Sequence, residues 1–425
     1  MLIKDDNQYR ALFEKHLVPM LSGSVLLPDL RDQRRTPSQP VARLGNSQSL
    51  GIQAREDDKR RFVLWRSQAF GNPEIELVRA FVEELRSILN ALDNGANDQT
   101  ALNVLLENLP TRTVVSRFGI LRDVADQVVR RMILLSQRSY EGKPITVAVA
   151  IDPSRQGDGA HVADYFRESF APVLTNGTDT ALFVGANARV CEYGVIPAGG
   201  GVSEEDVFAP IRFARIANWA RDGRVAIVLN RLGEILIFSD GCLQFARRSA
   251  RWHFFTHESG VVDLQRPQAE DVRRKMYLTL LDVSFARTGG GLGVVLAGKR
   301  PEDVAAIVGE QNLFDSPSPS DKTSLLARLV TKRFQELPRM VRAELLGIDG
   351  ATIINHHGDI LAVGAIVEVS KDVAGEGGAR EKAAKVLSKL GLGVKVSQDG
   401  GIQAFVHHEG PSKGKEAFKE ILTIS

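Results

Sequence analysis

The sequence is short of cysteine, of long apolar runs and of net charge, and each shortage excludes a class of protein. Cys191 and Cys242 are the only cysteines among 425 residues, which excludes a disulfide framework and a zinc site made of cysteine alone. No apolar run approaches the ~20 residues of a membrane-spanning helix, and the opening MLIKDDNQYR is too polar for a signal peptide. We therefore expect a soluble, cytoplasmic protein with no membrane partner.

The charge and composition are those of an ordinary globular protein. Lys and Arg number 54 against 52 Asp and Glu, and a net charge of +2 does not by itself identify a polyanionic partner. Hydrophobic residues make up 43% and charged residues 25%, which excludes whole-chain disorder, collagen and a coiled-coil rod. At ~150 residues per domain, the length predicts two or three domains.

The pattern along the chain predicts four segments. Residues 1–62 contain the Pro-, Ser-, Gln- and Gly-rich stretch TPSQPVARLGNSQSLGIQA and the charge run AREDDKRR, which predict a flexible arm. Residues 63–140 carry apolar side chains at intervals of three and four and form a helical region. Residues 141–270 hold apolar runs such as ITVAVAID and predict a mixed α/β region. Residues 271–425 form a further α/β domain.

This C-terminal domain alternates helical and strand patterns. A helix at 273–287 is followed by Gly289–Gly291, which we interpret as a turn, and by the buried strand LGVVLA. The stretch SDKTSLLARLVTKRFQEL predicts a helix over 320–337. Residues 351–369 then predict a strand, a polar turn and a second strand. The helix GAREKAAKVLSKLG and a hairpin around Asp399-Gly400-Gly401 close the domain.

The helix start at Gly377-Gly378-Ala379-Arg380 is the first candidate site. Two glycines lead into a helix whose first turn carries Arg380 and Lys382. Cations are electrostatically unfavourable at a helix N-terminus, and a bound anion such as phosphate would account for them. The alternative is a Gly-rich loop whose cations are solvated or paired with Glu376 and Glu381, and the residues leave both interpretations open.

Asp349-Gly350-Ala351 is the second candidate. An acid followed by two very small residues before a strand lets a bulky ligand approach the backbone, and the carboxylate could hold Mg²⁺ or Mn²⁺. Taken alone, a turn that begins with Asp explains the motif better.

Two further features are weaker candidates. The pairs His356-His357 and His407-His408 are typical of polar hairpin tips. The basic, aromatic stretch around Trp252 fits a partly buried strand better than a nucleic-acid contact.

Four pieces in register resemble the diadenylate cyclase (DAC) domain of DNA integrity scanning protein and its relatives. The resemblance covers about residues 272–410. LLDVSFARTGGGLGVVLA resembles the family's opening helix and first core strand, and IDGATII resembles the stretch around its Asp-Gly-Ala motif. GGAREKAAKVLSKLG resembles its Gly-Thr-Arg-His-Arg helix start, and VSQDGGIQAF resembles its closing Val-Ser-Glu-Glu hairpin. The resemblance implies a central mixed sheet flanked by helices, in which the strand after Ala351 pairs with the strand around Val396.

The resemblance also implies roles for individual residues. In active members two domains meet face to face, each with an ATP, and join the two ATP molecules into cyclic di-AMP. By this resemblance Asp349 and Asp399 bind metal, and Asp349 and Arg380 are catalytic. The residues that contact nucleotide or phosphate would be Gly350, Ala351, Gly378, Ala379, Arg380, Lys382 and Ser397.

Several departures from the family pattern weaken phosphate and metal binding. Ile348 stands where a His usually precedes Asp-Gly-Ala, and Ala379, Glu381 and Lys382 replace the Thr, His and second Arg of the helix start. Glu381 brings negative charge, and Lys382 lacks the bidentate fork of Arg. This pattern resembles the DAC-like families proposed as nucleotide sensors, the DACNV type among them.

Two functions of different classes follow. The first is a sensor that binds ATP or a cyclic dinucleotide, needs no metal cofactor and signals to an effector through its N-terminal region. The alternative is an active diadenylate cyclase, a nucleotidyltransferase that uses Mg²⁺ or Mn²⁺ and works as a head-to-head dimer or other homo-oligomer. We favour the sensor, because the departures fall on the residues that grip phosphate.

Overall fold

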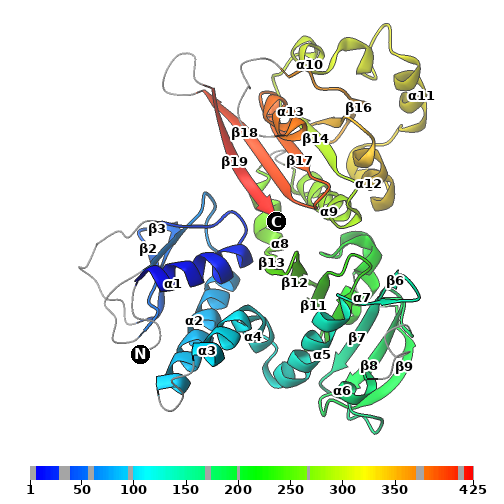
Figure 1. Cartoon of the computed structure of the whole chain (residues 1–425). Helices are drawn as coiled ribbons and strands as arrows, with labels where there is room; N and C mark the ends of the chain where they lie inside the picture. The colour runs from blue at the N-terminus through cyan, green and yellow to red at the C-terminus, as the bar shows by residue number, and fades with distance from the viewer. Residues whose placement is uncertain are drawn as a thin grey trace. The chain divides into compact units, whose positions relative to one another are not determined.

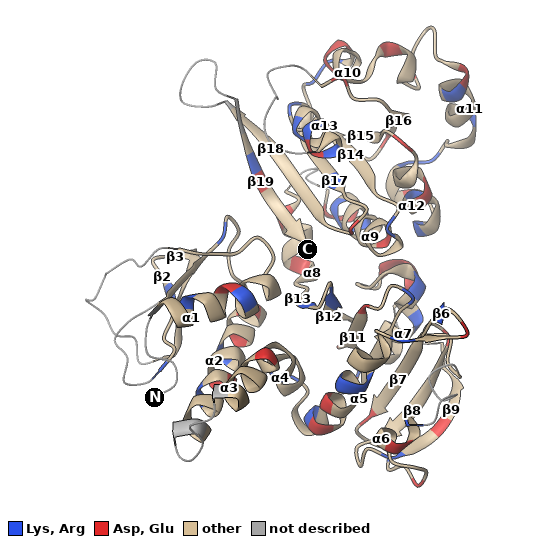
Figure 2. Ribbon diagram, viewed as in Figure 1, with Lys and Arg blue, Asp and Glu red and all other residues tan. Residues whose placement is uncertain are grey.

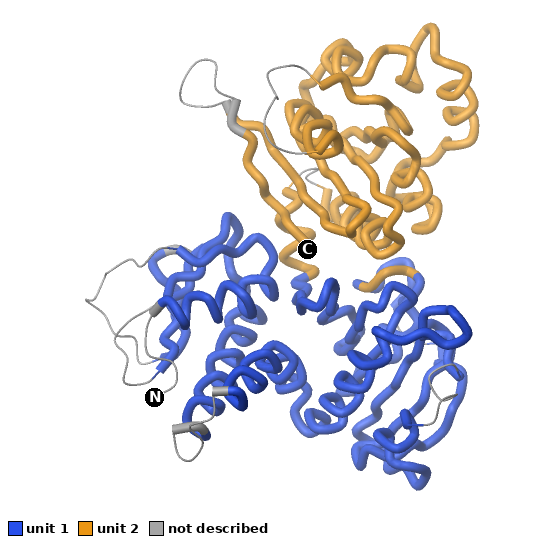
Figure 3. The backbone as a smooth tube through the Cα atoms, in the orientation of Figure 1, with its two compact units in different colours: residues 1–208, 212–256 blue, residues 209–211, 257–425 orange. Residues whose placement is uncertain are grey.

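The computed structural model describes residues 6–27, 39–55, 62–93, 99–167, 174–198, 202–265, 269–369, 378–409 and 416–424. The chain divides into two compact units (Figure 3): unit 1 is Met1–Phe208 with Arg212–Thr256, and unit 2 is Ala209–Ile211 with His257–Ser425. Each is an α/β structure of sheets flanked by helices, which confirms the predicted fold class. Within the described ranges, every helix is too short or too polar to cross a membrane.

Unit 1 contains two main sheets and the helices that pack on them. Its elements are α1 (Asp6–Leu12), the π-helix η1 (Phe13–Leu17), the 3₁₀ helix η2 (Val18–Met20), β1 (Val25–Leu26), β2 (Val41–Leu44), β3 (Asn46–Ile52), β4 (Phe62–Trp65), α2 (Asn72–Asp93), α3 (Gln99–Glu107), α4 (Leu109–Ser116), η3 (Gly119–Leu121), α5 (Arg122–Leu135), β5 (Ser139–Tyr140), β6 (Lys143–Pro144), β7 (Val147–Asp152), α6 (Val162–Tyr165), β8 (Thr180–Gly185), β9 (Val190–Val195), η5 (Glu204–Asp206), α7 (Ala214–Trp219), β10 (Val225–Leu229), β11 (Ile235–Ser239), β12 (Cys242–Arg248) and β13 (Arg251–Phe254).

The flexible arm predicted over residues 1–62 is wrong for the part of it that is described. Strands β1 to β4 form an antiparallel sheet in the order β1-β4-β3-β2, and α1 and η1 pack into the same core. Phe13 is fully buried, with its ring 5.1 Å from that of Phe62 and 6.1 Å from that of Phe81. The apolar residues of this segment are sparse in sequence, and they become buried because α2 supplies the surface that they lack locally.

A seven-stranded sheet in the order β13-β12-β11-β10-β7-β8-β9 forms the rest of unit 1. Strands β7 and β8 are parallel, and the other neighbours are antiparallel. Side chains of β7 and β10 such as Val149 and Ile227 share a core cluster with Val128 of α5. Alternate side chains point the other way, where the Phe183 ring lies 5.6 Å from that of Trp219 in α7. The sheet is therefore covered on both faces, which explains its long apolar strands.

The basic stretch around Trp252 belongs to this packed sheet. Trp252 is buried, and its indole N–H donates a hydrogen bond to Thr111 Oγ1 at 3.1 Å. Arg248 is also buried, and its Nε lies 3.3 Å from a carboxylate oxygen of Glu234. Both the Trp252 ring and Arg248 are part of the packed core, which agrees with the interpretation of this stretch as a buried strand. The buried ring gives no support to stacking on nucleic-acid bases.

The division into units also differs from the predicted segments. Helices α2 to α5 lie within the predicted helical region 63–140, and β7 to β13 lie within 141–270. However, residues of both segments share one core cluster with the N-terminal elements, and the second unit begins at His257 rather than near residue 271. Local patterns identified the elements but not the long-range packing that joins them.

Unit 2 is built on one six-stranded sheet. Its elements are α8 (His257–Asp263), α9 (Glu270–Ala286), β14 (Gly290–Val295), α10 (Pro301–Val308), η7 (Glu310–Asn312), α11 (Asp321–Leu329), η8 (Phe334–Glu336), α12 (Arg339–Gly347), β15 (Ala351–Asn355), β16 (Ile360–Ala365), α13 (Ala379–Ser388), β17 (Gly391–Val396), β18 (Ile402–Glu409) and β19 (Glu416–Ile424). The strand order is β16-β15-β14-β17-β18-β19.

Strand β14 is the centre of this sheet. It runs parallel to β15 and antiparallel to β17. The strand after Ala351 and the strand around Val396 therefore belong to one sheet, but they are not neighbours as predicted, because β14 lies between them. Helices α13 and α10 cover one face, where Leu387, Val304 and Ile353 share a core cluster (Figure 1). Helices α9 and α12 contact the other face.

Two of the three glycines that the sequence analysis interpreted as a turn, Gly290 and Gly291, are strand residues. Gly289 has φ +72°, and Gly290 and Gly291 already belong to β14. A Cβ on Gly290 would lie 2.5 Å from the carbonyl oxygen of Leu346 in α12. Glycine is needed here because a helix end approaches the strand too closely for a side chain.

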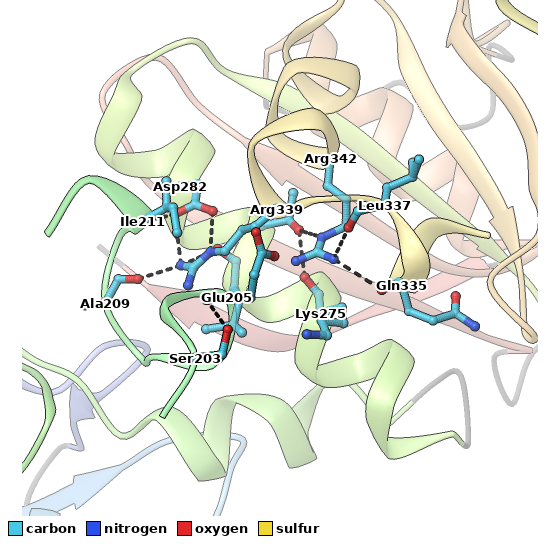
Figure 4. A network of polar contacts seen from close by, with 12 residues as sticks. Ser203, Glu205, Ala209, Ile211, Lys275, Asp282, Gln335, Leu337, Arg339 and Arg342 are labelled. Atoms are coloured by element: carbon cyan, nitrogen blue, oxygen red, sulfur yellow. Dashed lines mark hydrogen bonds and ion pairs between the residues drawn. The ribbon is translucent and has the colours of Figure 1, made fainter. Parts of the chain in front are cut away.

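Two arginines of α12 are the largest fully buried side chains of the described residues. Arg339 Nε and Nη2 donate to the Asp282 carboxylate of α9 at 2.6 and 2.9 Å, and Nη2 also donates to the Ala209 carbonyl (Figure 4). The backbone N–H of Ile211, which begins the short helix η6 (Ile211–Phe213), donates to Asp282 at 2.7 Å. Burial raises the pKa of the Asp282 carboxyl, and the Arg339 guanidinium opposes that shift.

The second arginine is held differently. Arg342 donates to the carbonyl of Leu337 at 2.7 Å and to Thr279 Oγ1 at 3.1 Å, and its guanidinium lies 5.9 Å from the centre of the Phe334 ring. A buried charge is tolerated only where such hydrogen bonds replace water. The two arginines thus link α12 to α9 through hydrogen bonds to Asp282 and Thr279.

We expect Asp282→Ala to destabilise unit 2 by about 3–5 kcal/mol, because it leaves the Arg339 charge buried without its carboxylate. Hydrogen exchange of α9 and α12 measures the effect. All three tryptophans, Trp65, Trp219 and Trp252, lie in unit 1, so their fluorescence reports that unit separately.

The control is Asp303→Asn, which removes an exposed ion pair with Arg300 while keeping an oxygen at the start of α10. This variant should behave like the parent. Unchanged exchange of α9 and α12 in Asp282→Ala would show that the buried pair does not hold these helices together.

Candidate functional site

Most of the residues singled out in the sequence gather at one edge of the unit 2 sheet. Because β14 and β15 are parallel and β17 is antiparallel to β14, the first two strands begin where β17 ends. Gly290 pairs with Val396, and Leu292 pairs with Thr352. We call this the amino edge, and the opposite end, where β14 and β15 finish, the carboxyl edge.

Asp349-Gly350-Ala351 lies at the amino edge, where the chain enters β15. Gly350 has φ +105°, and a Cβ there would lie 2.5 Å from the carbonyl carbon of Gly364 in β16. Ala351 is buried, and a Cβ on the neighbouring Gly291 would lie 3.4 Å from its Cβ. Close packing of three strands therefore explains the two small residues. Asp349 is exposed, and this packing does not explain its carboxylate.

Arg380 reaches the amino edge from the first turn of α13. The helix begins after Gly378, which offers no side-chain cap. Arg380 is exposed, and its guanidinium lies beside Gly289, where an added Cβ would be 2.7 Å from Nη1. The N–H groups of Glu381 and Lys382 bond to the Gly378 carbonyl, whereas the first N–H groups of a helix, here those of Ala379 and Arg380, have no intrahelical partner. Gly377, the other glycine of the motif, lies outside the described residues.

Two lysines pair with the Glu381 carboxylate and offset its negative charge. Its carboxylate accepts from Lys385 Nζ at 2.8 Å and from Lys395 Nζ of β17 at 2.9 Å. Burial acts to raise the pKa of Glu381, but these two bonds and the lysine charges outweigh it and lower the pKa. Arg380 and Lys382 are the neighbours of Glu381 in the sequence of this first turn, and Figure 2 shows both signs of charge on this helix. The negative charge expected to repel a phosphate is offset.

Ser397 and Asp399 form the turn that follows β17. The Ser397 hydroxyl donates to the Asp399 carboxylate, and the Gly401 N–H donates to the same carboxylate oxygen at 3.3 Å. The Ser397 bond, the Gly401 bond and the nearby Arg287 charge lower the pKa of Asp399. The Ser284 hydroxyl of α9 holds the Gly400 carbonyl at 2.6 Å. These contacts define a hydrogen-bonded turn, a structural role that needs no ligand.

The metal assignment of Asp349 and Asp399 stays a prediction. Asp349 precedes β15 and Asp399 follows β17, and β14 lies between these two strands. Among the described residues, no group of three or more His, Cys, Asp and Glu side chains is placed to hold a metal ion. Carboxylate oxygens are suitable ligands for Mg²⁺ or Mn²⁺, but Arg287 places positive charge near Asp399.

Two neighbours of the site could not be found from the sequence. Lys322 of α11 donates through Nζ to the Gly364 carbonyl at 2.7 Å, and an added Cβ on Gly364 would also lie 3.0 Å from the Asp349 carbonyl oxygen. Gly289 provides the surface beside the Arg380 guanidinium. Lys322 stands in an ordinary helical pattern, and Gly289 was interpreted as part of a turn, so no local signal marks either residue.

Comparison with known proteins identifies no family for this chain. No protein-family model matches the sequence. A search of curated proteins also found no match.

Glu381→Gln should reduce stability by about 0.5–1 kcal/mol near neutral pH, because it removes the charge from two partly exposed ion pairs. Since the folded pKa of Glu381 lies below its ordinary value of 4.5, the carboxylate stabilises the fold above that value. This contribution is lost as the pH falls through the lowered folded pKa. The difference between parent and variant should therefore shrink below about pH 4.5.

Urea unfolding at several pH values measures this difference. Glu344→Gln, an exposed carboxylate of α12 with no ion pair to another described residue, is the matched control. A difference between parent and Glu381→Gln that stays constant down to the acid limit of folding would contradict the role given to Lys385 and Lys395.

Proposed function

We propose that the protein binds a nucleotide or a nucleotide second messenger at the amino edge of unit 2 and acts as a sensor. The observation that carries the proposal is the position of Arg380. Its guanidinium lies beside Gly289 at the edge where Asp349 begins one segment and Ser397 ends another. Helix α13 thus brings a cation to the edge of the sheet where the Asp349 and Ser397 segments also lie.

The chemistry of this edge suits a phosphate group. An arginine fork offers paired N–H donors to phosphate oxygens, and the free N–H groups at the start of α13 add to them. Lys382, in the same turn, is partly exposed and supplies a further positive charge. The likeness of the Asp349, Arg380 and Ser397 segments to the DAC domain supports ATP or a cyclic dinucleotide as the ligand.

The sensor is favoured over the cyclase by the state of Asp399. A cyclase needs carboxylates to hold a metal against the triphosphate, and the Asp399 carboxylate is already bonded to Ser397 and Gly401. One observation supports the alternative, a diadenylate cyclase that works as a face-to-face dimer. Glu381 is neutralised by Lys385 and Lys395 and so repels a triphosphate less than its sequence position suggests.

Arg380→Ala should weaken nucleotide binding by about 1.5–3 kcal/mol, the value of a hydrogen bond to a charged group. The fold should persist, because Arg380 is exposed. Calorimetric titration with ATP and with cyclic di-AMP measures the change. Arg300→Ala, which removes the same charge from the carboxyl-edge side of β14, is the matched control and should bind as the parent does.

Equal nucleotide binding by the parent and by Arg380→Ala would contradict the assignment of a phosphate site to this edge. Incubation with ATP and Mn²⁺, followed by mass spectrometry, tests the alternative in the same preparation. Formation of cyclic di-AMP by the parent would contradict the sensor proposal and support the cyclase.

A further inference from the structure

A cleft of unit 2 lies at the carboxyl edge, away from the nucleotide candidates. It measures about 770 Å³ and is lined by the end of β14, the loop into α10, α10 itself, the loop at 313–317 and the turn after β15. The ends of adjacent parallel strands are where open α/β sheets commonly bind ligands. Strands β14 and β15 are the parallel pair of this sheet, so the cleft stands where this rule expects a site.

Small side chains create the space. Ala305 and Ala306 line the cleft from α10, and Leu296, Leu313 and Leu361 add larger apolar surface around them. Ordinary leucines at the two alanine positions would fill the hollow. The walls are therefore suited to the apolar body of a small organic molecule.

The charge around the cleft is predominantly negative. Glu302, Glu310 and Asp315 line it, against a single cation, Lys299. All four residues are exposed, and none forms a salt bridge with another described residue. Three carboxylates that line one cleft favour a positively charged guest and repel a phosphate.

One buried polar atom in the lining also lacks a partner. His356 lines the cleft, and its Nδ1 is buried without a hydrogen-bond partner among the described residues. The adjacent Asn355 takes part in its turn, since its amide donates to Asp359 at 2.8 Å and its oxygen accepts from the His357 N–H at 2.9 Å. Because this nitrogen is shielded from solvent, a ligand in the cleft reaches it only if the imidazole ring turns.

We propose that the carboxyl-edge cleft binds an organic cation, an amine or guanidinium group carried on an apolar body. The apolar walls hold the body, and the three carboxylates attract the charged end. The cleft is separate from the proposed nucleotide site, because β14 runs five residue steps from Gly290 to Val295, or ~17 Å at ~3.3 Å per residue. This proposal does not depend on nucleotide binding.

The test compares three ligands of one shape and different charge. Benzylamine, benzyl alcohol and benzoate are titrated into the full-length protein, and binding is followed by ligand-observed NMR and calorimetry. Benzylamine should bind most tightly, benzyl alcohol more weakly and benzoate least, and added salt should weaken benzylamine alone. Equal binding of all three, or none by benzylamine, would overturn the proposal.

Variants place the binding in the cleft. Glu302→Gln and Asp315→Asn should each weaken benzylamine binding roughly 2- to 5-fold, the range for an exposed charge pair. Ala305→Leu should abolish it by filling the space. Glu344→Gln, an exposed carboxylate that does not line the cleft, is the control and should bind as the parent does.

Binding that survives both neutralised carboxylates and Ala305→Leu would assign the amine to another place and end the proposal. ATP titrated into the same variants separates the two sites. Its affinity should not change with any of them, so failure of the nucleotide site and failure of the cation site give different results.

Discussion

The ion pair between Asp282 and Arg339 is the interaction on which the geometry of unit 2 depends. Both side chains are buried, so a small separation of the two helices would leave each charge without its partner before water could reach it. The pair therefore fixes α12 against α9. This in turn places the Leu346 carbonyl close above Gly290, where only a glycine fits. The packing at the start of β14, which forms part of the amino edge, therefore depends on a salt bridge outside the sheet.

The opposite face of the sheet is set by a similar close approach. A Cβ on Gly293 would lie 2.9 Å from the Ile353 side chain, and one on Gly393 would overlap the Ala384 carbonyl oxygen of α13. Helix α13 can lie this close to β14 and β17 only because those positions are glycine. Its nearness brings the first turn, with Arg380, to the start of β14. The glycines thus act through the backbone to position a cation.

The sequence predicted the local elements of unit 2 well. The hairpins β15–β16 and β17–β18 and helix α13 have clear turn residues and apolar periodicity. The helix expected over 320–337 was too long: it ends at Leu329, and the Phe334 N–H bonds instead to the Gly358 carbonyl, a partner that no local pattern reveals. The N-terminal segment was missed for the same reason, since Phe13 becomes buried only through residues as distant as Phe62 and Phe81.

The candidate site divides into residues that packing explains and residues that it does not. Gly350 and Ala351 are required by the close approach of β16 and β14, and Ser397 with Asp399 closes a turn. A family motif made of such residues can persist for structural reasons alone. Their resemblance therefore says more about the fold than about the ligand.

Asp349 and Arg380 are different, because both are exposed and neither is needed to hold the strands together. A cation at a helix N-terminus costs free energy unless something negative lies in front of it. The carboxyl edge shows the opposite bias, with Glu302 and Asp315 beside an apolar cleft. The two ends of β14 thus carry opposite charge biases, and these are the places where we propose that an anion and an organic cation bind.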